Sequence, residues 1–527
     1  KVEQALSTAH LIVKEKFDVS RVSANAMEPR GAIGDYNSNL DSYTLYADTQ
    51  GPHYLREIHA REIFNIPVEK LRVIAGDVGG AFGAKGVPYI EQRLCLWASK
   101  CINRPVKWIS TRNEGFQSDT HARDNVFDAE LALDREGNFL AIRVNSLANI
   151  GAYLSTDRGL LPTFSNLGTL AGVYKTPAIH VSVKAVFTNT NQTAPYRGAG
   201  RPEAAYVIEG LIEAAAREMK VDATKLRRKN MIAPEQMPFK TGLTFTYDCG
   251  NFIQNLNDAL SAAQYENFEK RRAAANRRGR LRGIGIANAI ERAADGPRPE
   301  FVKLSFDKDV KLTIVAGSKN QGQGHETMYK QIIGDKLGLN SEEIRFVDGD
   351  TDLIDGGTGT FGSRTASIGG GAIVKAVEGI VDKGKAIAAH NFETNSDNIT
   401  FDGEAFLSEG TNHRMTLSDV VRCSFDPANI PPQMEAGITQ TGRFETDGPN
   451  FPNGCNICEV EIDPETGQVE IVGYWSVEDF GTVINPLTLE GQIHGGIVQG
   501  AGQALFEEIV YDRESGQLLT ASFQDYC

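Results

Sequence analysis

LRVIAGDVGGAFGAKG, residues 71–86, decides the predicted fold, because it joins a strand directly to a glycine-rich loop. Its first five residues are rich in apolar and β-branched types and predict a strand. The glycines that follow leave backbone N–H groups open to a close ligand, since no side chain stands in front of them. Glycine-rich loops recur at 196–200 and 321–324, again beside predicted helices or strands. The sequence therefore predicts several ligand-binding loops at the ends of regular elements.

The order of the predicted elements favours an α+β fold over a doubly wound sheet. Strands and helices follow one another without a regular βαβ cadence. A chain of 527 residues is too long for one hydrophobic core. A basic, turn-prone stretch at 277–280 separates a polar helical run from an apolar strand. We therefore expect two domains, residues 1–280 and 281–527, each with mixed α and β structure.

Hydrophobic periodicity and turn residues predict the individual elements. The expected strands are 43–47, 71–75, 283–287 and 344–347, the expected hairpins are 302–316 and 459–472, and the expected helices are 51–64, 202–219 and a helix that ends at Leu337. Residues 489–507 are expected to form a buried helix that tolerates glycine.

Charge and cysteine content exclude several classes of protein. The 54 basic and 68 acidic residues give a net charge of -14, which repels phosphate backbones and anionic lipid headgroups. Nucleic acid is therefore not an expected partner. The apolar runs are far shorter than the ~20 residues that a membrane helix needs. Seven cysteines, an odd number, argue against a disulfide framework, and no targeting leader is visible, so a cytoplasmic location is expected.

The common motifs for nucleotide, zinc and nucleophile sites are incomplete. Ala84 and Gly86 flank Lys85, where a P-loop needs glycine before the lysine and serine or threonine after it. The Gly-x-Gly-x-x-Gly string at 357–362 starts about nine residues after the strand at 344–347, whereas a dinucleotide fingerprint follows its strand directly. The single CxxC lacks the second pair of a zinc site, and Gly-x-Ser-x-Gly is absent. A nucleotide-dependent enzyme remains an alternative.

Four glutamines lie beside glycines in or near these loops. Each carries two N–H donors and one carbonyl acceptor, which suits the edges of a pterin-like ring or a metal-oxo group. They are Gln50, Gln321, Gln323 and Gln492. Because a lone glutamine beside glycine is usually a solvated turn, only their joint arrangement supports a binding site.

Seven motifs that follow one another along the chain carry a resemblance. They are Met27-Glu28-Pro29-Arg30, Thr49-Gln50, residues 78–85, Ala194-Pro195-Tyr196-Arg197-Gly198, residues 322–327, Gly362-Ser363-Arg364 and residues 490–496. Together they resemble the molybdopterin-binding subunit of the molybdenum hydroxylases, the family of xanthine dehydrogenase, aldehyde oxidase and aerobic carbon monoxide dehydrogenase. The resemblance covers essentially the whole chain. It implies two molybdenum-cofactor-binding domains packed around a shared cofactor cleft.

Carried over residue by residue, the resemblance implies a site built from loops of both halves. It gives catalytic roles to Gln50, beside an oxo ligand of molybdenum, and to Arg197. The implied cofactor-binding residues are Gln50, Gly80, Ala81, Phe82, Gly83, Arg197, Gly198, Gln321, Gly322, Gln323, Gly324, Ser363, Arg364, Thr365, Ala366, Ser367 and Gln492. No side chain bonds the metal, which the pterin dithiolene holds in either the plain cofactor or its cytosine dinucleotide form.

The resemblance also implies a reaction and partners. The family's chemistry is oxidative hydroxylation with water as the oxygen source, and the electrons leave through Fe-S clusters and FAD on partner subunits or domains. A dimer of heterotrimers is the expected assembly. The family's general base, a glutamate in a Gly-x-Gly-Glu motif, lies farther downstream than the segment matched here. Since the chain ends at Cys527 before such a motif, the sequence is interpreted as a fragment that lacks both ends.

The implied substrate residues are Tyr196, Ala199 and Gly86. Gly198 stands where carbon monoxide dehydrogenases place a copper-binding cysteine, so carbon monoxide oxidation is not expected. Gly86 replaces a glutamate, and Ala199 a stacking phenylalanine, of the purine-oxidising members. A less crowded pocket with Tyr196 at its rim suits an aldehyde or an N-heteroaromatic ring. A non-catalytic molybdopterin-binding scaffold of the same fold remains an alternative.

Overall fold

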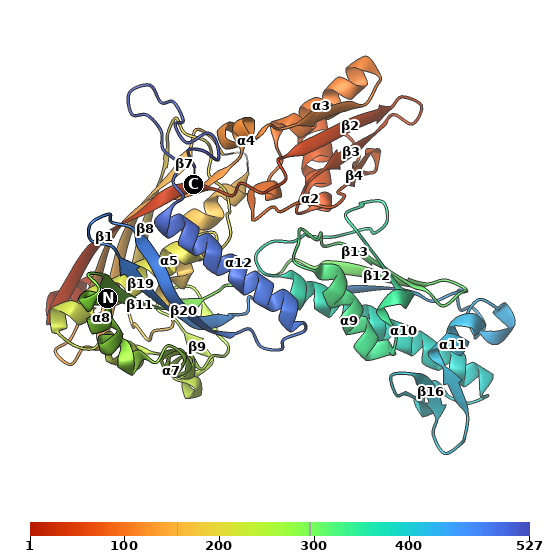
Figure 1. Cartoon of the computed structure of the whole chain (residues 1–527). Coiled ribbons are helices and arrows are strands. Elements are labelled where there is room, and N and C mark those ends of the chain that lie inside the picture. The colour runs from red at the N-terminus through yellow and green to blue at the C-terminus, as the bar shows by residue number, and fades with distance from the viewer. Residues whose placement is uncertain (155, 295–296, 527) are drawn as a thin grey trace.

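The computed structural model describes residues 1–154, 156–294 and 297–526, which fold into sheets with helices packed on them (Figure 1). The helices are α1 (Val2–Thr8), α2 (Pro52–Glu57), α3 (Ile90–Ile102), α4 (Arg112–Ser118), α5 (Arg201–Met219), α6 (Ala223–Asn230), α7 (Phe252–Ala262), α8 (Phe268–Arg277), α9 (His325–Leu337), α10 (Gly370–Asn391), α11 (Leu417–Cys423) and α12 (Pro486–Leu505). The strands are β1 (Leu11–Ser23), β2 (Gly31–Asn37), β3 (Ser42–Ala47), β4 (Leu71–Ile74), β5 (Val106–Ile109), β6 (His121–Leu133), β7 (Phe139–Gly151), β8 (Ile179–Phe187), β9 (Phe239–Lys240), β10 (Thr246–Tyr247), β11 (Leu281–Ile290), β12 (Glu300–Phe306), β13 (Leu312–Ala316), β14 (Ile344–Asp348), β15 (Ile399–Phe401), β16 (Ala405–Ser408), β17 (Arg414–Thr416), β18 (Thr439–Phe444), β19 (Asn453–Ile462) and β20 (Val469–Asp479).

The expected α+β fold class is confirmed. Most strand pairs are antiparallel, and the parallel pairs β3/β4, β7/β8 and β13/β14 belong to mixed sheets. The elements expected from the sequence are present, with bounds that shift by a few residues. The helix expected at 51–64 is divided into α2 and a π-helical stretch, Ile58–Phe64. The hairpin expected at 459–472 is β19 with β20, which is longer at both ends.

A small sheet with the order β4-β3-β2-β5 positions the first predicted site residues. β3 and β4 pair in parallel, so their carboxyl ends meet at one edge of the sheet. Gln50 follows β3, and the glycine-rich loop 78–86 follows β4. α3 packs on this sheet at the outer end of the molecule (Figure 1).

A second sheet, β14-β13-β12-β18, positions the second group of site residues in the same way. β13 and β14 pair in parallel, so loops 317–324 and 349–364 leave the sheet at the same edge. α10 covers the face formed by β12 and β18. Val302 of β12 and Ile373 and Ile380 of α10 are fully buried in the core between them.

The largest hydrophobic core contains segments from both halves of the sequence. It includes Phe127 of β6, Leu211 of α5 and Ile286 of β11. α5 contacts β1, β6 and β11, so the sheet β11-β19-β20 packs beside the long sheet β1-β6-β7-β8 (Figure 1). β11 thus lies beyond residue 280 in sequence but packs with the first half. The division at residue 280 remains a prediction.

A buried ion pair crosses this core. Arg227 of α6 donates to Glu209 of α5 at 2.8 Å and to the backbone carbonyl of Ile286 at 3.0 Å. The hydroxyl of Tyr174 donates to the other oxygen of Glu209 at 2.6 Å. Since Arg227 has no exposed surface, its charge depends on these partners rather than on water.

Residues 489–507 were expected to form a buried helix; the helix is present, but the expected burial was wrong. α12 covers most of this range, but none of its residues is buried, and the side chains of Leu487 and Val498 are 79% and 70% exposed. Periodicity and glycine content describe the surface of a helix and do not specify what covers it. In Figure 1, α12 crosses the middle of the molecule toward α9. Within residues 1–154, 156–294 and 297–526, no helix has the length and apolar character needed to cross a membrane.

Replacing Arg227 with methionine is expected to lower the free energy of unfolding by about 3–5 kcal/mol, because Glu209 is left as a buried, unpaired charge. Urea unfolding followed by circular dichroism measures the change. Lys229→Met on the exposed side of α6 is the matched control, with an expected change within about 0.5 kcal/mol. Equal destabilisation by the two variants would contradict this account of the pair.

Acidification is expected to destabilise the fold through His121. Burial and, to a smaller extent, the neighbouring Arg21 guanidinium together lower the pKa of His121 to about 3. As the pH falls from 6.5 toward 3, the unfolded chain binds a proton at this imidazole and the folded chain does not, so stability is lost over that window. Urea unfolding at several pH values checks this. His121→Gln is expected to flatten the dependence between pH 6.5 and 4, and an unchanged slope would rule out the imidazole as a cause.

Candidate functional site

Gln50 has its side-chain amide fixed in one orientation. The side chain is buried, with 3% of the residue exposed. The backbone N–H of Gly83 donates to Oε1 at 3.0 Å, which identifies that atom as the oxygen because an N–H cannot accept. Nε2 therefore donates to the carbonyl of Thr360 at 2.9 Å. The amide nitrogen has a second hydrogen, which suits contact with a ligand.

Loop 78–86 is held by Lys85. Its Nζ lies 2.7 Å from Glu28 and 2.8 Å from Asp48, and Glu28 also accepts the backbone N–H of Gly79 at 2.7 Å. Burial raises the pKa of Asp48, and the Lys85 ammonium opposes this rise. Because Lys85 is buried between two carboxylates, it holds the loop in place instead of reaching out to a phosphate.

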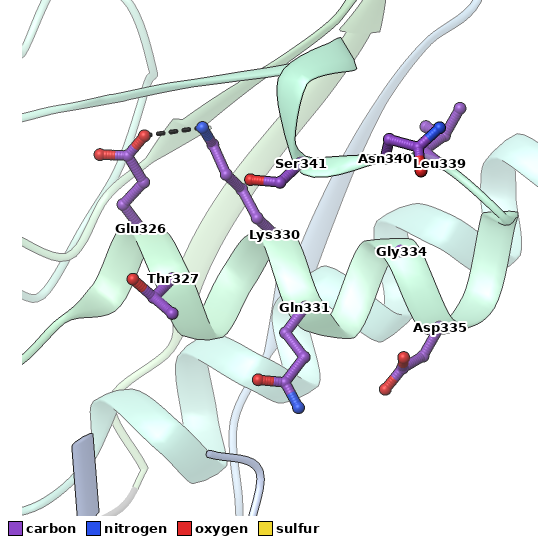
Figure 2. Close-up of a pocket in the computed structure, with 9 residues that line it drawn as sticks. All are labelled: Glu326, Thr327, Lys330, Gln331, Gly334, Asp335, Leu339, Asn340 and Ser341. Carbon is purple, nitrogen blue, oxygen red and sulfur yellow. Dashed lines mark ion pairs between the residues drawn. The ribbon is translucent and has the colours of Figure 1, made fainter. Parts of the chain in front are cut away.

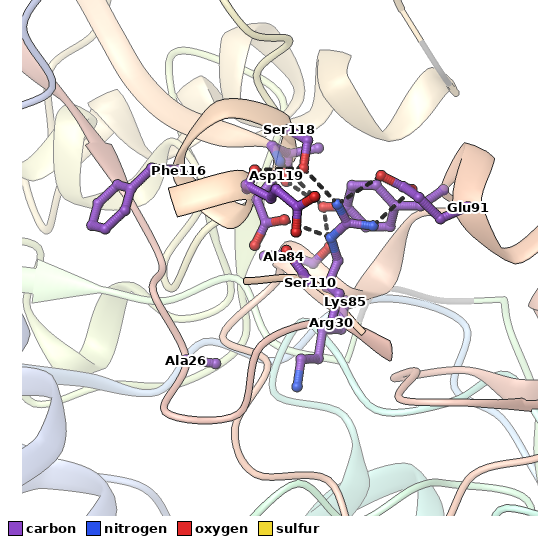
Figure 3. A network of polar contacts seen from close by, with 12 residues as sticks. Ala26, Arg30, Ala84, Lys85, Glu91, Ser110, Phe116, Ser118 and Asp119 are labelled. Carbon is purple, nitrogen blue, oxygen red and sulfur yellow. Dashed lines mark hydrogen bonds and ion pairs between the residues drawn. The ribbon is translucent and has the colours of Figure 1, made fainter. Parts of the chain in front are cut away.

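Arg30 lies beside loop 78–86 and supports it (Figure 3). Its guanidinium donates to Asp119 at 2.5 Å and to Glu91 at 3.0 Å, and it lies 3.6 Å from the ring centroid of Tyr89. The hydroxyl of Tyr89 donates to the backbone carbonyl of Ala84 at 2.8 Å. Charges and aromatic stacking therefore fix the carbonyl side of the loop.

Loop 194–200 packs directly against loop 78–86. The backbone N–H of Arg197 donates to the carbonyl of Phe82 at 2.8 Å. Gly83 has a φ of +116°, and a Cβ at this position would lie 2.0 Å from the carbonyl oxygen of Pro195. Only glycine combines this conformation with so close an approach. The two loops are thus held together through backbone atoms.

A buried arginine of β6 holds loop 194–200. Arg123 donates to the carbonyls of Tyr196 and Arg197 at 3.2 and 2.7 Å. It also pairs with the fully buried Glu203 at 3.4 Å, and Glu203 accepts the N–H of Gly200 at 2.9 Å. The conformation of this loop therefore depends on an ion pair that is closed to solvent.

One backbone carbonyl joins the predicted site residues of the two halves. The carbonyl of Thr360 accepts from Gln50 and also from Nε2 of Gln321 at 3.3 Å. The N–H of Thr360 in turn donates to the carbonyl of Gln50 at 2.9 Å. Gln323 accepts from the N–H of Gln321 at 2.7 Å. The three glutamines thus form one connected hydrogen-bonded group.

Lys319 and Asp348 tie together the loops after β13 and β14. Lys319 Nζ lies 2.6 Å from Asp348, and the N–H of Asn320 donates to the same carboxylate at 2.7 Å. Burial, assisted by Lys319, lowers the pKa of the neighbouring His325 to about 4. His325 is therefore a neutral imidazole at the start of α9.

Three of the five predicted residues in run 363–367 have accessible side chains. These are Ser363, Ala366 and Ser367. The hydroxyl of Thr365 is buried 3.2 Å from that of Thr360. Arg364 is also buried, with a guanidinium that bonds groups of the protein itself. The structure therefore exposes some side chains of residues 363–367 and buries others.

Arg197 lies along α12. Its Nη2 donates to the backbone carbonyl of Gln492 at 2.8 Å, and a Cβ on Gly495 would lie 3.1 Å from its Nη1. The side chain of Gln492 is exposed. Gly198 has a φ of +91°, and a Cβ there would lie 2.3 Å from Cγ of Pro202. Arg197 and Gln492 are therefore brought together, by way of the helix backbone.

The predicted substrate residues lie in different surroundings. A Cβ on Gly86 would lie 3.4 Å from Oε1 of Gln50 and 3.3 Å from Arg158, so Gly86 borders the Gln50 amide. Ala199 is buried. Tyr196 is buried as well, which raises its pKa to about 12. Of the three, Gly86 has the position best suited to contact a molecule beside Gln50, and the roles of all three remain predictions.

The comparisons with known proteins bear on this arrangement. Residues 1–231 and residues 258–527 each match a molybdopterin cofactor-binding domain. The chain belongs to the molybdopterin cofactor-binding family. The expected family and the presence of two such domains are thereby confirmed.

Members of the family resemble the chain over its whole length. It is 31% identical over 100% of its length to the 6-hydroxypseudooxynicotine dehydrogenase complex subunit gamma of Paenarthrobacter nicotinovorans, covering 66% of that protein. It is 32% identical over 99% of its length to the carbon monoxide dehydrogenase large chain of Afipia carboxidovorans, covering 67%. Quinoline 2-oxidoreductase from Pseudomonas putida 86 superposes with a TM-score of 0.95 at 32% identity, with 100% of this chain and 68% of that one covered. The chain thus spans about two thirds of the length of these relatives.

The residues present fit molybdopterin. Gly322 and Gly362 have positive φ angles and no atom within 4 Å of the place where a Cβ would stand, so a ligand could approach the chain closely on that side. The amides of Gln50 and Gln323 supply a donor for a ring edge, whereas both side-chain N–H groups of Gln321 donate to the carbonyls of Lys319 and Thr360. Within the described part of the chain, no three His, Cys, Asp or Glu side chains form a metal-binding group.

Sequence reasoning missed Thr360 and Lys319. Thr360 acts through its backbone carbonyl, for which residue type gives no signal. Lys319 follows a buried strand within three residues, as Asp348 ends the neighbouring one. Opposite charges at the ends of two adjacent strands are a pattern that could have identified this pair.

A separate hollow of about 460 Å³ lies along α9. Figure 2 shows Glu326 and Lys330 paired on one side of it, and Asn340 and Ser341 on the loop beyond the helix. None of the predicted site residues lines it. Gln331, also at this hollow, donates to the carbonyl of Ile484 at 2.5 Å and so connects α9 to the start of α12.

Replacing Gly83 with alanine is expected to separate loop 78–86 from Pro195, because the added Cβ has no room and the φ is unfavourable. The molybdenum content of the purified protein is expected to fall about tenfold or more, as when groups that orient a metal site are removed. Elemental analysis measures it. Gly76→Ala, where a Cβ would meet no atom within 4 Å, is the control. Equal molybdenum in both variants would show that the contact is dispensable.

Proposed function

We propose that the chain is the cofactor-binding part of a molybdenum hydroxylase that hydroxylates an N-heteroaromatic ring or an aldehyde with oxygen from water. The observation that carries the proposal is the hydrogen-bonded group of Gln50, Gln321 and Gln323, which joins loops of both halves in a molybdopterin cofactor-binding chain. When bound, molybdopterin supplies the metal centre at which the substrate carbon is oxidised.

The chain's own residues bind and orient. Gln50 presents an N–H whose direction is set by Gly83 and Thr360, and a donor that is already oriented needs no rearrangement when charge develops nearby. Gln323, and Gln321 through its side-chain oxygen, would hold the pterin edges. Arg197, held against α12, would add positive charge on the side of loop 78–86.

Two glycines and the names of two relatives bear on the substrate class. Gly198 has no side chain with which to ligate a copper ion, which disfavours carbon monoxide. Gly86 lies between the amide of Gln50 and the guanidinium of Arg158, where a Cβ would lie 3.4 and 3.3 Å from them, so a larger side chain such as glutamate has no room there. Two of the relatives are named for N-heteroaromatic compounds, quinoline and a nicotine derivative. An N-heteroaromatic ring is therefore the favoured substrate, with an aldehyde second.

Partner subunits with Fe-S clusters and FAD belong to the same proposal, in a dimer of heterotrimers in the cytoplasm. The relatives' names support a multi-subunit complex, since they include a complex subunit and a large chain. The cysteines in the described residues are free thiols, which suits a reducing compartment. The plain and cytosine dinucleotide forms of the cofactor are distinguished by mass spectrometry of the released cofactor.

Purified with its partner subunits, the protein is expected to contain molybdenum and to hydroxylate quinoline-type rings or aldehydes faster than xanthine or carbon monoxide. Product formed in ¹⁸O-labelled water is expected to carry the label. Gln50→Ala is expected to lower kcat by about 10²–10³-fold, the usual effect of removing one oriented donor. Xanthine turned over fastest would refute the substrate class, and bound molybdenum without any turnover would favour a non-catalytic scaffold.

A further inference from the structure

Glu300 and Arg364 form a buried ion pair beside the predicted site. Glu300, the first residue of β12, has no exposed surface, and Arg364 is 2% exposed. Nη1 of Arg364 donates to a carboxylate oxygen of Glu300. The guanidinium also donates to the carbonyl of Gly359 at 3.0 Å and to that of Arg298 at 2.6 Å.

Glu300 holds the same segment from its other side. Its carboxylate accepts the backbone N–H of Thr358 at 3.2 Å and that of Gly359 at 3.3 Å. Burial raises the pKa of Glu300, and the Arg364 guanidinium opposes this rise. The pair therefore holds the N–H groups of Thr358 and Gly359 and the carbonyl of Gly359 in fixed positions.

Residues 358–360 place the carbonyl of Thr360 beside Gln50 and Gln321. Gln50 and Gln321 both donate to that oxygen. The approach is close, since a Cβ on Gly359 would lie 2.6 Å from the carbonyl oxygen of Gln50. A small rotation of residues 358–360 would therefore remove the acceptor that the two amides share.

The pair is poorly explained as a source of stability. Burying two charges costs about as much as their attraction returns, and apolar residues of similar size often stabilise a fold as well or better. An ion pair with several hydrogen bonds instead fixes the orientation of the groups that it contacts. We infer that Glu300 is a positioning residue, which through Arg364 and residues 358–360 orients the amide of Gln50 toward the cofactor and fixes that of Gln321 beside it. This inference rests on the proposed function.

The inference also revises the part expected of Arg364. Its guanidinium is occupied by Glu300 and two backbone carbonyls, so it acts on the cofactor through the loop and not as a direct ligand of a phosphate. The side chain of Ser363 next to it is exposed.

The test uses the protein purified with its partner subunits and cofactor. Glu300→Gln keeps the size of the side chain but replaces one accepting oxygen with an N–H₂ group. This group cannot accept the hydrogen bonds that Gly359 and Arg364 donate. The Mo(V) electron paramagnetic resonance spectrum of the reduced protein is expected to shift, and kcat per bound molybdenum to fall about 10–100-fold with KM little changed. In a Gln50→Ala background, the same substitution is expected to lower kcat by a much smaller factor, because the orientation it disturbs is already lost.

Glu209→Gln is the matched control, since Glu209 is also a buried glutamate paired with an arginine but lies in the core around α5. It is expected to lower the melting temperature and to leave the spectrum unchanged.

If Glu300→Gln also leaves the spectrum unchanged, or if its effect on kcat multiplies fully with that of Gln50→Ala, the inference is overturned. Should Glu300→Gln fail to fold, Arg364→Lys keeps the charge with a single contact, and an unaltered spectrum there overturns the inference equally. Absence of molybdenum from the unmodified protein would instead overturn the proposed function.

Discussion

Ion pairs behind the loops, each with at least one buried partner, are the constraint on which the candidate site depends. The pairs are Lys85 with Glu28 and Asp48, Arg123 with Glu203, Lys319 with Asp348, and Arg364 with Glu300. Each pair also bonds backbone groups of the loop it supports. Because a charge without water must keep its partners, a loop held in this way cannot relax without a large cost. The donors that face the ligand are thereby set in direction before any ligand binds.

Much of the fold was predictable because the deciding signals are local. The strand at 71–75 and the helix at 202–219 are present as β4 and α5, since alternating or 3.6-residue apolar patterns specify them directly. The ordered motifs also identified the family, which the match of both halves confirms. The packing of β11 against α5 of the first half was not predictable, because a contact between elements far apart in the sequence leaves no local pattern.

The candidate site was predictable to the extent that it uses side chains. Gln50 and Gln321 stand out as amides beside glycine, and the structure connects them. Their common acceptor, the carbonyl of Thr360, could not be found in this way, because every residue has a carbonyl. Glu300 was missed for a related reason: a glutamate at the start of a strand is ordinarily solvated, and only the three-dimensional packing shows that it is enclosed.

The uncovered surface of α12 has a consequence for motion. Five glycines in residues 486–505 each weaken the helix by about 1 kcal/mol relative to alanine, and no buried side chain compensates for them. Local unfolding of such a segment requires less free energy than opening of a core helix. Since Arg197 donates to the carbonyl of Gln492, each transient fraying of that turn would free a guanidinium next to loop 78–86. The stability of α12 would thus determine how long that cation keeps one position.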